Sequence, residues 1–434
     1  MTVAVHARSC YADSANPAPD RPALVESVDC DVCVVGGGIA GCSTALHLAE
    51  RGFRVVLLEA HHVGWGASGR SGAQAISGIA TGQARLEELI GRADARHVWD
   101  VTVEGLALLR SLIARFRIGC DWRDGQMQVA MNPRQERDLR AELQLLRGRY
   151  GYESVRFVGR EELRTMLASP RYTAGLCDTN GGHLHPLNYT LGLAEAAESF
   201  GARIFEDTRA LSYARAPLAG AAASAPLRVR TPRGEVRCRH LVLAGNTYLG
   251  PLAPALRPRI MAVGTQIIAT ERLGAGPAHA LIPSDVAVSD LNWVLDYFRR
   301  SADHRLIFGG RVSYSGRDSF ATAKAARARM LAVFPQLSGT GIDYAWGGQV
   351  DITRNRAPHF GRLEPDVYFL QGFSGHGIVL TGIAGKLIAE AIAGTAGRFD
   401  VFARIPHRSF PGGIALRRPA LMLAMLGYRL RDLL

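Results

Sequence analysis

Lysine is almost absent from this chain. It occurs only at Lys324 and Lys386, although lysine and arginine together number 51 of the 434 residues. Arginine is therefore the default basic residue, and the net charge of +12 is dispersed without any block of five like charges. Because proteins that bind nucleic acid concentrate basic charge on one face or in one stretch, this pattern argues against a nucleic-acid partner.

Cysteine is scarce, and its spacing excludes a disulfide framework. The 7 cysteines are an odd and scattered set, which favours a reducing compartment and therefore a cytoplasmic protein. Cys30 and Cys33 have CxxC spacing, but side chains three positions apart on an extended strand point to opposite faces. We therefore expect two small residues packed beside a sheet rather than a metal site or a redox pair.

Long apolar runs are missing as well. No uninterrupted stretch of about 18 apolar residues is present, so we expect no transmembrane segment. The longest candidate, Leu421–Leu426, is short and is followed by Arg429 and Arg431, as in a closing amphipathic helix. The first 20 residues do not combine a basic start with an apolar stretch, so we expect no secretory signal.

The clearest positive feature is a glycine turn between two apolar runs in residues 31–59. Gly36 permits a tight turn, Gly38 lets the backbone approach a pyrophosphate, and Gly41 lets the following helix pack closely on the strand. The helix start offers N–H groups to phosphates, and Glu59 lies where a carboxylate accepts ribose hydroxyls. The pattern predicts a dinucleotide site formed by Gly36, Gly37, Gly38, Ile39, Ala40, Gly41, Glu59 and Ala60.

Further glycine turns follow apolar stretches at 64–74, at 241–246 and at 372–377. A nicotinamide cofactor needs only one such turn, whereas a late helix start at Gly375 would favour the negative charge of reduced flavin. The chain therefore favours FAD over NAD. The additional residues predicted to bind it are Gly66, Ala67, Ser68, Arg70, Ser71, Gly72, Gly245, Gly372, Gly375, His376, Gly377 and Ile378.

These motifs resemble the FAD-dependent amine and amino-acid oxidase family, which includes D-amino-acid oxidase, glycine oxidase and sarcosine oxidase. Within it, the chain is most similar to the subgroup of gamma-glutamylputrescine oxidases. The segments that carry the resemblance are Ser9–Ala12 with Ala15 and Asn16, Gly64–Gln74, Asp296–Arg299, Phe308–Arg311, Trp346–Gly348, Gly372–Gly377 and Pro406–Gly413. The resemblance implies oxidation of a small-molecule amine to an imine, which water splits to an aldehyde.

The resemblance and the strand positions together predict an α/β (α+β) fold with two interleaved domains. We expect a Rossmann-like FAD-binding domain and a discontinuous second domain that contains a mostly antiparallel mixed β-sheet. The FAD-binding domain is expected to comprise residues 29–100, 175–255 and 346–400, and the substrate domain residues 101–174 and 256–345. An irregular lead (1–28) and a C-terminal tail with a helix (401–434) complete the prediction.

Two departures from the family bear on the cofactor and on the electron acceptor. Several relatives attach FAD through a cysteine late in the chain, but the last cysteine here is Cys238, so we expect noncovalent FAD. Sarcosine oxidases resemble each other in a lysine near the flavin, and the comparable stretch 305–311 has none. The acceptor is therefore O2 or another electron acceptor, and the sequence indicates no oligomeric state.

Hydride transfer to a flavin needs positioning rather than a catalytic triad or metal. The catalytic candidates are Arg70, Gln74 and His376, which the motifs place at the flavin edge. His183 and His185 form an HxH without companion ligands, so we expect no metal. Candidates for an aromatic wall are Trp65, Tyr297, Phe298 and Trp346, and candidates for a carboxylate clamp are Arg299, Arg311 and Arg354, although each alone also fits core or surface.

Three functions remain open. The first is an oxidase acting on gamma-glutamylputrescine or a similar omega-amino compound by hydride transfer to flavin N5, with O2 giving H2O2. The second is an FAD-dependent D-amino-acid or imino-acid dehydrogenase that uses a quinone acceptor. The third is a non-catalytic or partner-dependent flavoprotein subunit.

Overall fold

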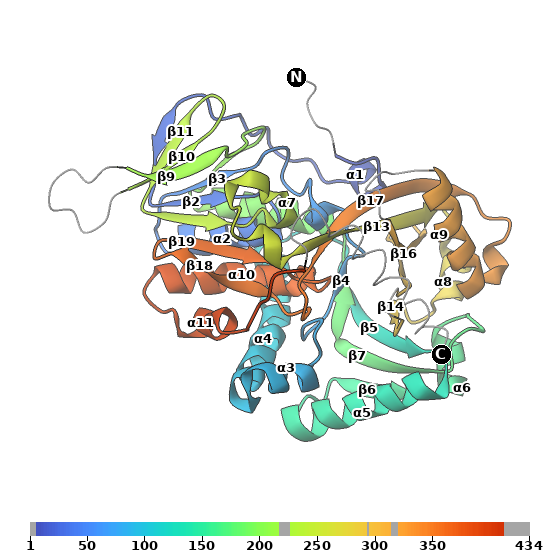
Figure 1. Cartoon of the computed structure of the whole chain (residues 1–434). Coiled ribbons are helices and arrows are strands. Elements are labelled where there is room, and N and C mark those ends of the chain that lie inside the picture. The colour runs from blue at the N-terminus through green and yellow to red at the C-terminus, as the bar shows by residue number, and fades with distance from the viewer. Residues whose placement is uncertain (1–5, 217–225, 293–294, 314–319, 412–434) are drawn as a thin grey trace.

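The computed structural model describes residues 6–216, 226–292, 295–313 and 320–411. Three sheets organise these residues, and helices cover the two larger ones (Figure 1). The apolar stretch predicted at Leu421–Leu426 lies outside the described residues.

The first sheet has six strands in the order β18-β19-β12-β2-β3-β8. Five neighbouring strands run parallel: β19, β12, β2, β3 and β8. The edge strand β18 pairs antiparallel with β19. Every residue of β2 and β3 is buried, because helices cover the sheet and the strands are rich in valine and leucine. The strands are β2 (Val32–Val35), β3 (Val55–Leu58), β8 (Arg203–Phe205), β12 (His240–Leu243), β18 (His359–Glu364) and β19 (Val367–Gln371).

Helix α2 (Ile39–Ala49) packs between α7 (Pro186–Ser199) and α10 (Gly377–Ile392), and the long helix α4 (Arg92–Phe116) packs on α10. The α2–α10 contact depends on a glycine, since a Cβ at position 385 would lie 2.6 Å from the backbone nitrogen of Thr44. The first helix of the dinucleotide unit and the last long helix are thereby held together, although they are over 300 residues apart in sequence.

The second sheet has nine strands and is mostly antiparallel. Its order is β17-β13-β16-β15-β14-β5-β7-β4, with β6 paired to β7. The strands are β4 (Gln74–Ala75), β5 (Arg123–Ala130), β6 (Val155–Val158), β7 (Ala174–His183), β13 (Met261–Thr270), β14 (Ala287–Asp290), β15 (Tyr297–Arg300), β16 (Leu306–Ser313) and β17 (Ile342–Ile352). The remaining helices are α3 (Gln83–Ile90), α5 (Pro133–Tyr150), α6 (Arg160–Met166), α8 (Ala275–Leu281), α9 (Phe320–Val333) and α11 (Gly397–Ala403).

A small sheet in the order β1-β11-β10-β9 lies beside the six-stranded sheet. It comprises β1 (Ser27–Asp29), β9 (Ser212–Arg215), β10 (Leu227–Arg230) and β11 (Glu235–Cys238). Its strands β9, β10 and β11 form an antiparallel meander. The N-terminal lead is not wholly irregular, because it contains the short helix α1 (Cys10–Asp13). This helix lies beside β17 (Figure 1).

The predicted fold class, a mixed α/β fold, is confirmed. The division into two domains stays a prediction, but sheet membership differs from it in three places. β4, β7 and residues 346–352 of β17 belong to the nine-stranded sheet and not to the six-stranded sheet. Within the described residues, no single helix is long and apolar enough to cross a membrane, and only the bent pair α10 and α11 passes that test by length and composition.

The prediction that Cys30 and Cys33 face apart is wrong. Cys30 precedes β2 instead of lying on it, and both thiols pack in one apolar cluster beside Cys238. All seven cysteines are free and buried. The hydrogen bond with the Cys238 thiol, and next to it burial, raise the pKa of Cys30, so it stays a neutral packing residue.

Candidate cofactor and active site

The turn after β2 forms a tight cradle against the end of β12. Gly36 has a φ of +112°, and a Cβ there would lie 2.9 Å from the backbone of Ala244 and Gly245. Gly41, in the first turn of α2, would place a Cβ 1.8 Å from the carbonyl oxygen of Gly36. The structure therefore brings the predicted Gly245 to the predicted phosphate turn, and leaves no room for side chains there.

The start of α2 is open toward a ligand. Gly38 is its N-cap and supplies no side-chain hydrogen bond, while the N–H of Ile39 donates to Ser68 Oγ at 3.0 Å. Within the described part of the chain, the N–H groups of Ala40 and Gly41 have no protein partner. Free N–H groups and the positive end of the helix dipole suit a pyrophosphate, so this part of the site fits a dinucleotide.

Glu59 follows β3 and reaches back to the glycine turn. Its Oε2 accepts from the N–H of Gly37 at 2.6 Å, and its Oε1 accepts from the N–H of His61 at 2.9 Å. Burial raises the pKa of Glu59, although these N–H groups oppose that shift. The acid and the glycine turn are thus one hydrogen-bonded unit, with Ala60 next to it in the chain.

The Gly64–Gln74 loop runs from this unit to the nine-stranded sheet. Arg70 does not extend away from the loop, because its Nε donates to the carbonyl of Trp65 at 2.7 Å and its guanidinium lies 4.3 Å from the Trp65 ring centroid. The carbonyl of Arg70 accepts from Trp346 Nε1 at 3.1 Å. At the far end, Gln74 donates to the carbonyl of Val288 at 2.8 Å, so its amide fastens the loop to β14.

Tyr297 of β15 is pressed between two glycines. A Cβ at Gly72 would lie 2.4 Å from its ring, and a Cβ at Gly309 of β16 would lie 2.1 Å from it. Burial raises the pKa of the Tyr297 hydroxyl, which therefore stays protonated. Tyr297 and Trp346 thus both contact the Gly64–Gln74 loop, Tyr297 at Gly72 and Trp346 at the carbonyl of Arg70.

The late glycine turn is held by a buried carboxylate that the sequence did not reveal. Asp351 of β17 accepts from the N–H groups of Gly372 and Phe373, the latter at 3.0 Å. Burial raises the pKa of Asp351, and these hydrogen bonds oppose the shift. Asp351 fixes a strained backbone, since Ser374 in the same turn has a φ of 52°.

His376 ends that turn as the N-cap of α10, which begins at Gly377 rather than at the predicted Gly375. Burial lowers the pKa of His376 to about 4, so the imidazole is neutral near pH 7. Its Nδ1 is buried and has no hydrogen-bond partner among the described residues. A neutral ring with one unsatisfied nitrogen suits a contact with a bound ligand.

The other candidates are placed as follows. Phe298 and Trp346 are each 1% exposed and belong to apolar core clusters. Arg299 is buried and bonds to neighbouring oxygens, while Arg354 donates to the carbonyl of Ser409 near the surface. The side chain of Arg311 lies outside the described residues.

The HxH pair serves the fold. His183 hydrogen-bonds the carbonyl of Asp285 at 2.8 Å, and His185 caps α7 by accepting from the N–H of Asn188 at 3.1 Å. Among the residues that the structure describes, no group of three or more His, Cys, Asp or Glu side chains is arranged to hold a metal ion.

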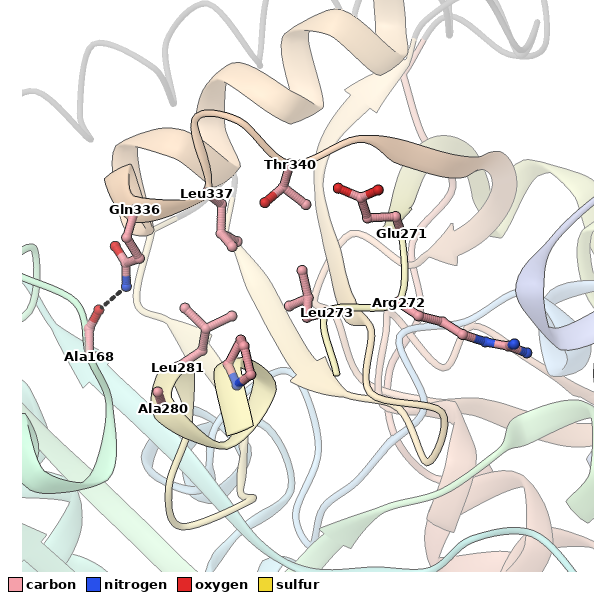
Figure 2. A pocket seen from close by; sticks show the side chains of 10 residues that line it. Ala168, Glu271, Arg272, Leu273, Ala280, Leu281, Gln336, Leu337 and Thr340 are labelled. Carbon is pink, nitrogen blue, oxygen red and sulfur yellow. Dashed lines mark hydrogen bonds between the residues drawn. The ribbon is translucent and has the colours of Figure 1, made fainter. Parts of the chain in front are cut away.

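A cavity of about 660 Å³ lies away from the glycine turns, next to α8 and the end of β13 in the nine-stranded sheet (Figure 2). Leu273, Leu281 and Leu337 form its apolar part, and Glu271 lies at its edge. None of its lining residues belongs to the glycine turns, so it is not the cofactor site.

Two buried side chains beside the 64–74 loop and the late turn, Tyr11 and Asp351, were not among the predicted site residues. Tyr11 lies in the lead, where only its place in the resembling Ser9–Ala12 segment marked it. Asp351 had no signal, because no sequence motif links a carboxylate of β17 to the later glycine turn.

A glycine-lined cradle, a helix start with free N–H groups and a carboxylate bonded to the glycine turn are the features of a dinucleotide-binding protein. A family model described as FAD dependent oxidoreductase matches residues 31–391, and the chain belongs to this family. The predicted family resemblance is therefore confirmed.

The chain is 43% identical over 428 residues to the gamma-glutamylputrescine oxidoreductase of Escherichia coli (strain K12), a match that covers 98% of each chain. It is 38% identical over 431 residues to the probable oxidoreductase OrdL of Haemophilus influenzae, covering 98% of this chain and 97% of that one. Glycine oxidase from Bacillus cereus superposes with a TM-score of 0.71 at 20% identity, covering 88% of this chain and 99% of that one. That likeness shows the fold.

Proposed function

We propose that this protein holds FAD noncovalently and oxidises the primary or secondary amine of gamma-glutamylputrescine or a similar omega-amino compound. The imine product would be hydrolysed to an aldehyde. The observation that carries this proposal is the 43% identity to a gamma-glutamylputrescine oxidoreductase along 98% of both chains. Such coverage includes the nine-stranded sheet as well as the glycine turns.

The residues around the glycine turns support FAD binding from both ends. The Gly36–Gly41 turn and the α2 N–H groups suit the pyrophosphate, and Glu59 suits the ribose. The Ser68–Gly72 backbone and the turn before α10 would hold the ring system, with the positive end of α10 and the neutral His376 beside it. When bound, FAD supplies the hydride acceptor, and the chain supplies orientation and a site shielded from water.

The predicted catalytic residues take more specific roles in this proposal. His376 is the candidate for contact with substrate or ring, because its Nδ1 is unsatisfied. Arg70 would act through its backbone, since its side chain bonds to Trp65 on its own loop. Gln74 would fix the loop end on Val288 rather than touch the substrate.

The identity of the electron acceptor depends on the groups beside the 64–74 loop. Lys386 of α10 pairs with Glu104 at 2.6 Å, and Lys324 is exposed on α9. Neither lysine of the chain therefore lies at the flavin-edge loop. We propose O2 as the acceptor, with a quinone as the alternative that this lysine distribution keeps open.

Anaerobic mixing of the yellow holoprotein with a panel of compounds tests the proposal. The panel contains gamma-glutamylputrescine, putrescine, D-amino acids and proline, and flavin absorbance is the readout. We expect gamma-glutamylputrescine to bleach the flavin fastest, and readmitted air to restore the colour with one H2O2 per flavin.

Retention of colour with every amine would refute the proposed substrate. Faster bleaching by a D-amino or imino acid, with reoxidation by a quinone analogue and not by air, would establish the dehydrogenase instead. Turnover by the single purified chain would remove the partner-dependent subunit. The matched control is Gly148→Ala in α5, where an added Cβ meets nothing within 4 Å.

A further inference from the structure

Tyr11 joins the N-terminal segment to the flavin-edge loop. Its side chain is 1% exposed, and its ring packs edge-on against Trp346 and His185 at centroid distances of 5.3 and 5.1 Å. Its hydroxyl donates to the carbonyl of Ser71 at 3.2 Å and accepts from Arg299 Nη2 at 2.9 Å. Helix α1 has only four residues and lies far from the glycine turns in sequence. Through Tyr11 it nevertheless reaches the 64–74 loop, which follows β3 and Glu59.

Arg299 carries a buried positive charge that has only neutral partners. It is 5% exposed, and besides Tyr11 it donates to the carbonyls of Gly72 at 3.3 Å and of Arg300 at 3.0 Å. No carboxylate among the described residues lies within ion-pair distance of it. Because a buried charge without a counter-charge is costly to maintain, its retention here needs a reason.

The two side chains converge on consecutive carbonyls of one loop. Tyr11 holds the carbonyl of Ser71 and Arg299 holds that of Gly72, just before Ala73, which has a φ of 63°. In a planar trans peptide the N–H points away from the carbonyl, so each bond also fixes the direction of the following N–H group. A strained backbone of this kind persists only where its surroundings over-determine it.

We propose that Tyr11 and Arg299 form a positioning pair that holds the Ser71–Ala73 backbone at the ring end of FAD. The buried charge of Arg299 also favours the reduced, more negative form of the bound cofactor over the oxidised form. The helix α1 is then part of the flavin site. This inference rests on the proposed placement of the ring end at the Ser68–Gly72 loop, and not on the identity of the substrate.

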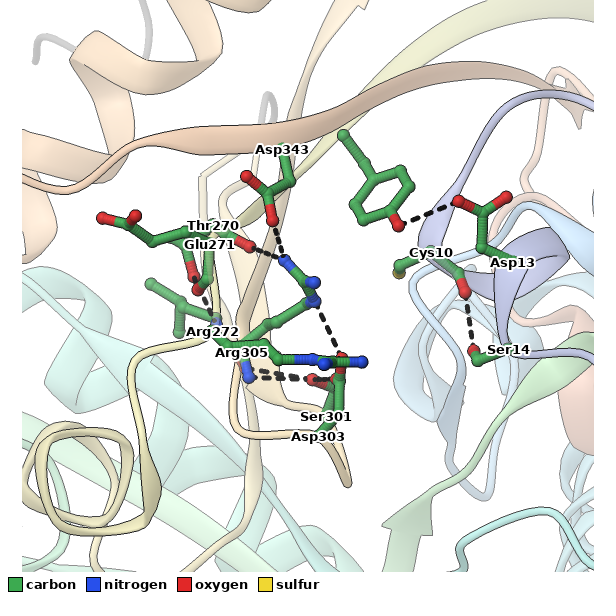
Figure 3. A network of polar contacts seen from close by, with 12 residues as sticks. Cys10, Asp13, Ser14, Thr270, Glu271, Arg272, Ser301, Asp303, Arg305 and Asp343 are labelled. Carbon is green, nitrogen blue, oxygen red and sulfur yellow. Dashed lines mark hydrogen bonds and ion pairs between the residues drawn. The ribbon is translucent and has the colours of Figure 1, made fainter.

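The first test compares Tyr11→Phe with Tyr344→Phe in the purified holoprotein. Both variants lose one hydroxyl that ties α1 to the protein, since Tyr344 of β17 donates to Asp13 at 2.9 Å. That second tie belongs to the polar network around Arg305, Asp303 and Asp343, which does not include the loop (Figure 3). Tyr344→Phe therefore controls for a loosening of α1 that does not involve the loop.

We expect Tyr11→Phe to weaken FAD binding about fivefold and to slow flavin reduction by the amine about tenfold, as loss of geometry at a reacting centre does. Tyr344→Phe should match the wild type in both measurements. Equal behaviour of the two variants would overturn the loop-positioning role.

The second test separates charge from geometry at Arg299 through the midpoint potential of the bound flavin, which needs no substrate. Arg299→Gln should lower the preference for reduced over oxidised FAD about tenfold, or about 30 mV for a two-electron couple. Arg299→Lys keeps the charge but not the fork of donors, so it should restore the potential and leave flavin reduction slow.

An unchanged potential in Arg299→Gln would refute the electrostatic part. If Arg299→Gln does not fold, Arg299→Lys decides: wild-type flavin reduction in that variant would show that the hydrogen bonds to the loop are dispensable. A protein that no amine bleaches would refute the proposed substrate, yet FAD affinities and potentials would still test the pair.

Discussion

The two ends of the candidate FAD site are built in opposite ways. The ADP end is contained almost entirely in residues 31–59, where one strand, one turn, one helix and one acid follow each other directly. The ring end is assembled from α1, the 64–74 loop, β15, β17 and the turn before α10. These segments lie far apart in the chain, and the Arg299–Tyr11 hydrogen bond alone spans 288 positions.

Different physical effects constrain the two ends of the candidate FAD site. Steric limits on the backbone govern the ADP end, so a single added methyl group is enough to block it. Hydrogen bonds between buried side chains and loop carbonyls govern the ring end, where loss of one bond shifts geometry and leaves the site in place. Substitutions at the two ends should therefore differ in kind as well as in size.

The largest effect is expected at the ADP end from Gly41→Ala. The new Cβ would lie 1.8 Å from the carbonyl oxygen of Gly36, so α2 must move away from the turn. A clash of this kind costs up to about 3 kcal/mol, which corresponds to about a 100-fold loss of FAD affinity. Titration of the apoprotein with FAD measures the effect, and wild-type affinity would contradict it.

At the ring end, Gly72→Ala should change FAD affinity little but slow flavin reduction by the amine. Its Cβ would lie 2.4 Å from the Tyr297 ring, so the loop or the ring must shift. Misplacement of about 1 Å costs up to about 100-fold in rate, whereas FAD affinity should change less than in Gly41→Ala. Stopped-flow flavin reduction measures the rate, and adding Tyr297→Leu should recover part of it. No recovery would show that the clash lies elsewhere.

A smaller effect is expected from Asp351→Asn under the late turn. The N–H groups of Gly372 and Phe373 both donate to the same oxygen, Oδ2, so the amide oxygen can accept from both but without the negative charge that strengthens these bonds. Because a hydrogen bond to a charged group contributes about 1 kcal/mol more than a neutral one, the two bonds together lose about 2 kcal/mol and the urea midpoint should fall. Asp343→Asn on the same strand is the control, because its pair with Arg305 is half exposed and contributes at most about 1 kcal/mol. Equal losses would contradict the role of Asp351.

These contrasts also explain what the sequence could reveal. The glycine turn and Glu59 belong to one strand–turn–helix–strand motif in residues 31–59, so the motif itself indicated both of them. The faces of Cys30 and Cys33 were mispredicted because the strand starts two residues later than the apolar pattern implies. Tyr11 and Asp351 could not be predicted, since an ordinary tyrosine or aspartate acquires its role only when folding brings a distant carbonyl or N–H group to it.

The smallest expected effect is a loss of stability in acid through His183 and His185, which lie near the ring end. Burial, with the charge of Arg299 as the next cause, lowers the pKa of His183 to about 3 and of His185 to about 4 from 6.5. The unfolded chain therefore takes up these protons first, so their contribution to stability is complete above pH 6.5 and is lost as the pH falls below it. Each group contributes a slope of about 1.4 kcal/mol per pH unit.

His185→Asn isolates one of these groups, because asparagine is also a good N-cap and can still accept from the N–H of Asn188. Between pH 6.5 and 5.5 the variant should lose about 1 kcal/mol less unfolding free energy than the wild type. Urea midpoints at the two pH values measure the difference, with the exposed His279→Asn of α8 as control. If His185→Asn instead follows the wild-type pH dependence, protonation of His185 does not limit stability in acid.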